Sequence, residues 1–273
     1  MPDRVVVYST LFILCVFTFI AMLMSNWKVI GISWIAFASM AAAIPMGVKA
    51  AAQHRLNHLI AGYGLASGAM ITSAAIFLVP TAMNHHPVYG GLGIALGIMA
   101  GFAIHTLNHG LTHTSSSIDP VVLELTSHAL SAGLIIGIVY AAMPELGLLL
   151  GIAIVSHKGP AGYAASRRLA KQGKSAVLIL LPASAIGLTA LPVSLLNIPG
   201  NDVVNALIFG FATGVFFHVA IDFLPECEVG GKIHRETNLE HDEHHKLDQY
   251  RQWAVLYTFL GGLAVFLAWY MAY

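Results

Sequence analysis

Apolar runs long enough to cross a membrane recur along almost the whole chain. A helix of about 20 apolar residues spans the roughly 30 Å hydrocarbon core of a bilayer. Because the hydrocarbon offers no water to unpaired backbone groups, only helices and closed barrels cross it. The sequence therefore predicts an all-α integral membrane protein. We expect nine transmembrane helices, at 5–24, 29–49, 58–83, 89–113, 119–142, 146–166, 175–196, 202–226 and 252–272.

The composition agrees with a chain whose surface faces lipid. Of its 273 residues, 57% are hydrophobic and only 10% are charged, whereas soluble domains carry about 25% charged residues. The formal net charge is zero, so no basic field for nucleic acid is expected. The two cysteines, Cys15 and Cys227, lie far apart and offer no disulfide framework.

The distribution of lysine and arginine predicts the orientation of these spans. Cytoplasmic loops are enriched in both residue types. With the N-terminus in the cytoplasm, eleven of the 13 lie in inside loops, Lys28 lies outside and Lys158 falls within a span. We therefore expect a multi-pass protein of the plasma membrane with its N-terminus cytoplasmic and its C-terminus outside.

Two internal similarities suggest an inverted repeat. The segment 66–80 resembles 212–225, and His128 and His157 are each followed, after three residues, by Ala-Gly. Members of each pair run in opposite directions in the predicted topology, as in transporters built from inverted repeats. We expect a single transmembrane domain, 1–273, with an inverted 3+2+3 arrangement. It comprises an extra N-terminal helix (5–24), a first repeat (29–113), a central helix pair (119–166) and a second repeat (175–272) that contains a cytoplasmic, histidine-rich loop (227–251).

Four ionisable residues inside the predicted spans are the main candidates for a functional site. They are His128, His157, His218 and Asp222. Ionisable groups in membrane spans are costly, and they commonly mark ion pathways. Neutral imidazoles bind zinc or iron, and the i, i+4 spacing of His218 and Asp222 suits a shared metal or a carboxylate that orients the ring. The alternative is a set of hydrogen bonds between helices.

Further polar residues extend this candidate metal site toward the cytoplasmic side. Lys158 adjoins His157, and its charge would take the place of a second metal ion. Glu124 precedes His128 by one helical turn. A metal pathway is predicted to continue through a histidine stripe in the fourth span and through the cytoplasmic loop. Its members are His105, His109, His113, Glu226, His241, His244 and His245.

These motifs resemble the ZIP (Zrt/Irt-like) family of divalent metal transporters. The segments 128–133 and 157–169 are similar to the family's paired metal-binding helices, 214–226 to its penultimate helix, and 68–80 to the counterpart of that helix in the other repeat. The resemblance covers spans two to nine. Ala132 and Ala161 stand where the family usually has glutamate ligands, so the chain resembles a divergent member.

The resemblance implies a permease rather than an enzyme. Its substrate would be a divalent metal ion, zinc or iron, because imidazole dominates the remaining ligands. The ion would pass a midplane His/Asp site by alternating access. Partners would be the lipid bilayer, the metal ion and, in a homodimer, a second copy of the chain. One alternative is a ZIP-fold protein without transport activity that senses metal or acts as a scaffold. Another is a membrane di-iron enzyme that uses the histidine boxes at 54–58, 105–109 and 241–245.

Overall fold

The chain folds into helices throughout the part that the structure describes. A computed structural model describes residues 2–52, 57–112, 119–142, 157–196, 201–222, 224 and 244–272, and no strand occurs among them. The longer helices are α1 (Pro2–Leu23), α2 (Trp27–Ala51), α3 (Asn57–Ser73), α5 (Pro87–Thr112), α6 (Pro120–Ala142), α8 (Lys158–Lys171), α9 (Leu180–Val193), α10 (Asp202–Asp222) and α12 (His244–Ala272). The short elements are η1 (Ala74–Leu78), α4 (Val79–His85) and η2 (Ala176–Ile179).

Seven helices among the described residues are long and apolar enough to cross a membrane. They correspond to the first, second, third, fifth, seventh, eighth and ninth predicted spans. The fourth predicted span coincides with α5, in which Pro87–Ala103 forms a shorter apolar stretch of helix. Much of the sixth span, 146–156, lies outside the described residues. The all-α fold class is therefore confirmed, with seven described helices that could span a membrane, and the count of nine and the repeat remain predictions.

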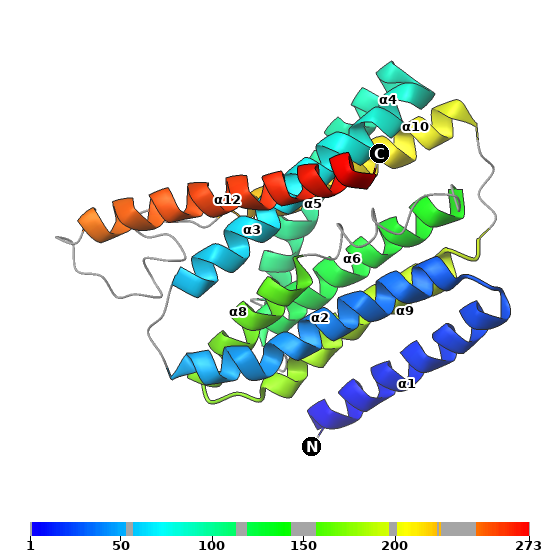
Figure 1. The fold of residues 1–273 in the computed structure, drawn as a ribbon. Coiled ribbons are helices and arrows are strands. Elements are labelled where there is room, and N and C mark those ends of the chain that lie inside the picture. The colour runs from blue at the N-terminus through cyan, green and yellow to red at the C-terminus, as the bar shows by residue number, and fades with distance from the viewer. Residues whose placement is uncertain are drawn as a thin grey trace.

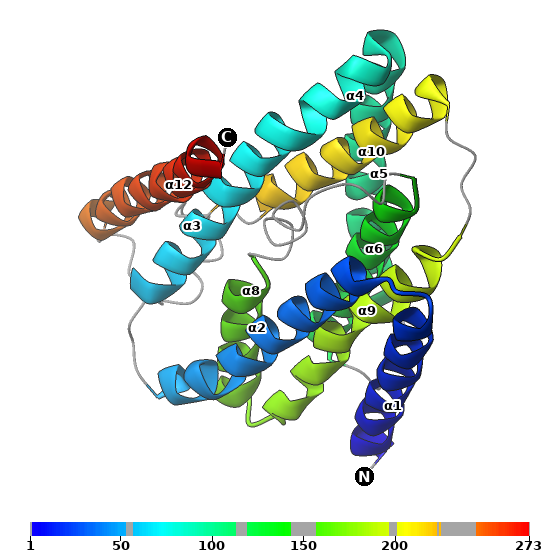
Figure 2. The same cartoon turned by 45° about the vertical axis from the view of Figure 1, so that its right-hand side comes forward.

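The helices form two bundles, which Figures 1 and 2 show from two sides. In the first bundle, α2 packs against α8 and α9, α6 packs against α9, and α1 covers α9. In the second, α5 packs along α10 and α3 packs along α12, while α3 and α4 also contact α10. Contacts between the bundles are sparser and come mainly from α6 with α5 and α10, and from α3 with α8.

Small residues bring the paired helices into close contact. A Cβ atom at Gly68 of α3 would overlap the backbone of Thr258 on α12, and one at Gly214 of α10 would overlap the Ile94 carbonyl of α5. Membrane helices gain little from hydrophobic association, because lipid tails are as apolar as their side chains. Close backbone approach, with the dispersion contacts it allows, therefore holds these pairs together.

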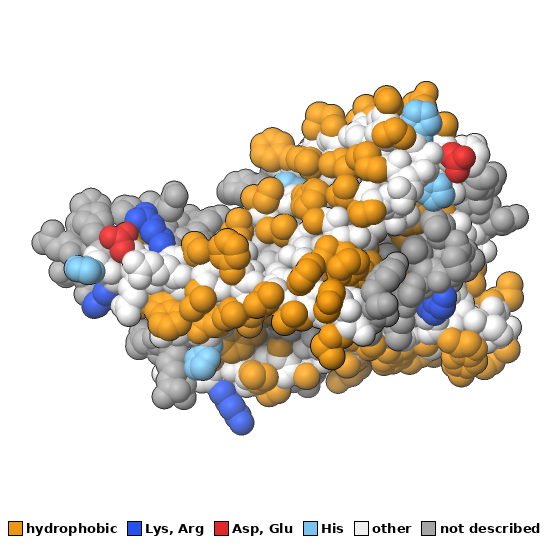
Figure 3. All heavy atoms as spheres, turned by 45° about the horizontal axis from the view of Figure 1, so that its top comes forward, with side chains coloured by type: hydrophobic (Ala, Val, Ile, Leu, Met, Phe, Trp, Pro, Cys, Tyr) orange, Lys and Arg blue, Asp and Glu red, His pale blue; other side chains and the backbone are white. Residues whose placement is uncertain are grey.

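The outer surface is apolar over a broad face. Figure 3 shows hydrophobic side chains covering the middle of one face, with charged side chains and histidines gathered toward its ends. Large apolar residues on α1 and α12 are strongly exposed, such as Phe12 at 70% and Phe259 at 74%. Soluble monomers rarely expose apolar patches of this extent. This surface is compatible with a lipid bilayer as the surrounding medium.

Two local features differ from the predicted spans. The helix α12 begins at His244, so 244–251 is helical rather than part of the predicted loop. Leu247 is buried there, and Arg251 donates to Asp248 one turn earlier at 2.8 Å, which stabilises the helix start. The third span contains the π-helical turn η1 just before Pro80, whose nitrogen has no hydrogen to donate to the helix ladder.

Candidate functional site

Two of the predicted site histidines meet inside the first bundle. His128 lies in the middle of α6, and His157 immediately precedes α8, where its carbonyl accepts the first intrahelical hydrogen bond from Ala161. Their Nε2 atoms are 3.4 Å apart, and the ring planes are inclined by 67°. His157 is buried and His128 is partly buried. The structure thus brings together two imidazoles that are 29 residues apart in sequence.

The separation of these two nitrogens suits a shared tetrahedral metal ion. Zinc binds imidazole nitrogen at about 2.0–2.1 Å. Two nitrogens 3.4 Å apart, each at that distance from one ion, subtend an angle of about 110° at the metal. Without metal, the same distance allows a hydrogen bond from one neutral ring to the other. The pair can therefore supply two of the four ligands of a zinc site.

Local sequence explains why His157 reaches this position. Pro160 lies in the first turn of α8, where a missing backbone N–H costs nothing. A Cβ atom at Gly162 would lie 2.7 Å from the Met40 carbonyl, so glycine lets α8 approach α2 closely. Ala132 and Ala161, one turn beyond the two histidines, are both buried. The positions at which the family resemblance would place carboxylates are filled by small apolar side chains.

The other two predicted ligands lie in the second bundle. His218 and Asp222 occupy the last turns of α10, and His218 Nε2 is 3.2 Å from Asp222 Oδ2. The His218 ring rests against Gly101 of α5. This contact fixes where the imidazole lies, because the glycine leaves no room for the ring to move toward α5. A carboxylate that holds an imidazole in this way is a common support of metal-binding histidines.

A third ionisable side chain lies beside the histidine pair. Lys158 directly follows His157 at the start of α8, and its side chain is buried in the first bundle. Among the described residues, however, no three His, Cys, Asp or Glu side chains lie close enough together to hold one metal ion. The four predicted ligands therefore form two pairs, one on each bundle.

The remaining predicted site residues fall largely outside the described part of the chain. His113, Glu226 and His241 are not among the described residues. The backbone positions of Glu124, His105, His109 and His244 lie on α6, α5 and α12, but their side chains are not described. His245 is exposed near the start of α12. The predicted pathway and the histidine-box alternative therefore remain predictions.

Sequence reasoning missed one buried contact beside the second pair. The Ser67 hydroxyl of α3 donates a 2.6 Å hydrogen bond to the carbonyl of Ala220, which lies between His218 and Asp222. Carbonyls in the last turn of a helix lack intrahelical partners, so this bond anchors the end of α10 that carries His218 and Asp222 to α3. The similarity of 66–80 to 212–225 drew attention to both segments but did not predict that they touch.

Comparison with known proteins does not assign this chain to a family. No protein-family model matches the chain, and no curated protein matches it. The case for a function therefore rests on the residues and their geometry.

Proposed function

We propose that this protein is a ZIP-like permease that moves a divalent transition metal, zinc or iron(II), across the membrane. The observation that carries the proposal is the imidazole pair His128–His157, which lies between helices of an apolar bundle, with His157 buried, His128 partly buried and their Nε2 atoms 3.4 Å apart. Imidazoles are costly to leave unsatisfied in a membrane interior. Imidazole donors favour zinc or iron over calcium or magnesium, which prefer oxygen.

The ligand sphere would be completed across the gap between the bundles. The first pair supplies two nitrogens from α6 and the start of α8, and His218 with Asp222 lies on α10 of the other bundle. A relative shift of the bundles would bring the two pairs around one ion, and the opposite shift would release it.

The packing of the helices supports the inverted repeat and suggests which parts move. Exchanging α2 with α9, α3 with α10, α5 with α12 and α6 with α8 converts the α2–α8 contact into α9–α6, and α5–α10 into α12–α3. All four are the major contacts of the fold. Each bundle contains helices from both repeats, so alternating access would move bundle against bundle rather than repeat against repeat.

The positions of charged residues support the proposed location and orientation. A multi-pass protein of the plasma membrane with a cytoplasmic N-terminus would place Arg168, Lys171 and Lys174, between the central pair and the second repeat, in the cytoplasm. All three are exposed. The ion would then enter from the outer side and leave past Glu124 and the histidine stripe of α5.

Metal analysis of the purified protein tests the site directly. The full chain in lipid nanodiscs, loaded with zinc or iron(II) and desalted, is expected to retain stoichiometric metal. His128→Ala and His157→Ala, singly and together, are expected to lose it because each removes a ligand. His85→Ala is the matched control, since His85 bonds to Asp202 far from the site. Stoichiometric metal in the double variant contradicts the proposal.

A second candidate function is favoured by the alanines beside the histidines. Buried Ala132 and Ala161 leave a site with fewer charged ligands than a transporter of this kind would carry. A ZIP-fold protein that binds metal without moving it would act as a sensor or scaffold. Uptake of radioactive zinc into proteoliposomes distinguishes a transporter from a protein that only binds metal. Metal binding that depends on His128 and His157, with no uptake of zinc, iron or manganese, assigns the non-transporting function.

A further inference from the structure

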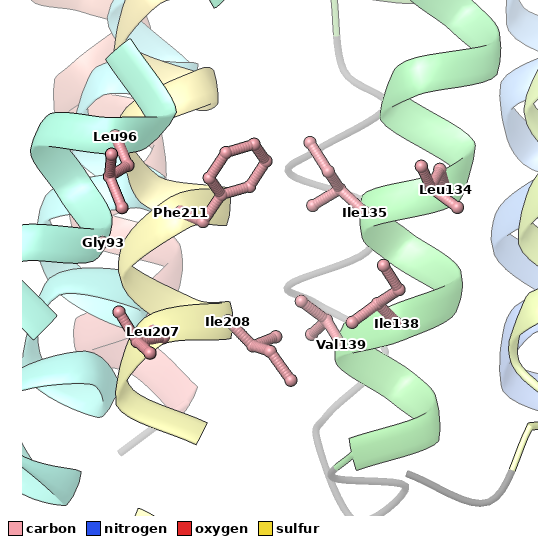
Figure 4. Close-up of a pocket in the computed structure, with 9 residues that line it drawn as sticks. All are labelled: Gly93, Leu96, Leu134, Ile135, Ile138, Val139, Leu207, Ile208 and Phe211. Atoms are coloured by element: carbon pink, nitrogen blue, oxygen red, sulfur yellow. The ribbon is translucent and has the colours of Figure 1, made fainter. Parts of the chain in front are cut away.

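An apolar cavity separates the two bundles at a level different from the histidine pair. Its volume is about 330 Å³. Figure 4 shows side chains of α5 and α10 facing those of α6 across it, with Phe211 and Ile208 pointing toward Ile135 and Val139. The described residues that line it are Gly93, Leu96, Leu134, Ile135, Ile138, Val139, Leu207, Ile208 and Phe211.

The walls determine what can occupy this space. None of the nine described lining residues carries a polar side-chain atom. Water enters a cavity only where it finds several polar partners, and apolar cavities of this kind stay dry. A metal ion would find no ligand among these nine residues. The described walls therefore suit an uncharged, apolar group that needs no hydrogen bonds.

The position of the cavity gives the acyl chains of bilayer lipids access to it. It lies beside the first turns of α5 and α10 and the last turns of α6, well within the length of these apolar helices. Leu96 and Leu134 line the cavity and are also 42% and 44% exposed, on a surface that faces lipid. Hydrocarbon chains of the bilayer thus have direct lateral access from the half of the membrane that the predicted orientation places outside.

We propose that this cavity binds one acyl chain of a membrane phospholipid. Its volume falls within the range of ligand pockets, about 300–1,000 Å³. An empty space of this size would cost its lining residues their dispersion contacts, and a flexible chain restores them on both walls. The bound chain contacts α6 of one bundle together with α5 and α10 of the other. It therefore bridges the elements that would move in the proposed transport, although its binding does not depend on that function.

Photo-crosslinking locates the bound chain. The full-length protein is placed in nanodiscs that contain phosphatidylcholine with a diazirine on one acyl chain, then irradiated, digested and mapped by mass spectrometry. Labelling is expected to concentrate at 134–139 and 207–211. Ile138→Trp fills the cavity and should lower this labelling several-fold. Ile98→Trp, on the exposed face of α5 outside the cavity, is the matched control and should not change it.

Two further variants keep the test decisive. Ile138→Ala enlarges the cavity without adding bulk and is expected to retain or increase the labelling, even where tryptophan disturbs folding. Ile138→Cys, in a chain with Cys15→Ser and Cys227→Ser, is expected to resist a water-soluble maleimide. Uniform labelling of all lipid-facing helices, unchanged by Ile138→Trp, overturns the proposal. Rapid maleimide reaction at position 138 also overturns it, because the cavity would then hold water. Neither outcome bears on metal retention by His128 and His157.

Discussion

Replacing Gly101 with alanine tests the position of His218 more directly than replacing the histidine itself. A Cβ atom at Gly101 would lie 2.6, 2.7 and 2.9 Å from Cδ2, Cγ and Cβ of His218. Because the contact includes His218 Cβ, a rotation of the imidazole ring alone cannot relieve it. A change of the His218 χ1 rotamer relieves the contacts with Cγ and Cδ2 and breaks the contact with Asp222, whereas the contact with Cβ is relieved only if α5 and α10 move apart.

The size of the required movement follows from these distances. Carbon atoms in contact prefer separations of about 3.5–4.0 Å, so the imidazole or the helix must shift by about 1 Å. Overpacking of this kind destabilises by about 1–3 kcal/mol, and replacing glycine in a helix offsets about 1 kcal/mol of that cost. We expect a net loss of about 0–2 kcal/mol in the free energy of unfolding. A misplacement of about 1 Å costs about 100-fold in enzymes, and we expect zinc uptake to fall about tenfold or more.

The same helix offers a matched control for this experiment. Gly91 has no atom within 4 Å of the position that its Cβ would take. Gly91→Ala should therefore stabilise the protein by about 0.5–1 kcal/mol and leave uptake unchanged. Both variants are compared in proteoliposomes for zinc uptake and in nanodiscs for thermal unfolding.

The two variants test separately whether His218 packs against Gly101 and whether its position matters for transport. If Gly101→Ala matches Gly91→Ala in stability and in uptake, then His218 does not rest on α5 as described. If Gly101→Ala lowers stability but leaves uptake intact, the packing holds and the role of His218 in transport is wrong.

Three other substitutions test contacts around the two bundles. Ser67→Ala removes the hydrogen bond to Ala220 and should lower the free energy of unfolding by about 1–2 kcal/mol, measured by thermal unfolding in nanodiscs; an unchanged midpoint would show that the bond contributes nothing. Lys174→Met removes the ion pair between Lys174 and the buried Asp119 carboxylate; because Lys174 is half exposed, we expect a loss of only about 1 kcal/mol in the free energy of unfolding. The double change Asp119→Asn with Lys174→Met should show a smaller loss, and equal losses in the two proteins would exclude coupling between these residues. Gly173→Ala should cost about 1 kcal/mol because Gly173 has φ +70°, and Gly173→Asn should cost less, since asparagine tolerates this conformation; equal stability of all three proteins would contradict that reason.

The helical membrane architecture was predictable because its signal is local. A run of apolar residues such as 5–24 both satisfies its backbone internally and excludes charges, so length and composition are sufficient. The ends were less predictable, as α12 shows by starting at His244. Polar residues there form helix because Leu247 packs inward, and that contact cannot be read from hydropathy.

The sequence by itself determined that the chain forms long apolar helices that could cross a membrane, and that His128 and His157 are unusual within them. The cost of placing ionisable groups in hydrocarbon is a property of each residue, so it is visible one span at a time. Only the tertiary structure decided that their Nε2 atoms meet, that His218 and Asp222 lie on the other bundle, and that an apolar cavity separates the two. Those facts depend on which helices pair, and pairing in lipid is governed by the close fit of small residues such as Gly68 and Gly214. That fit involves both partner helices at once, and no single span contains it.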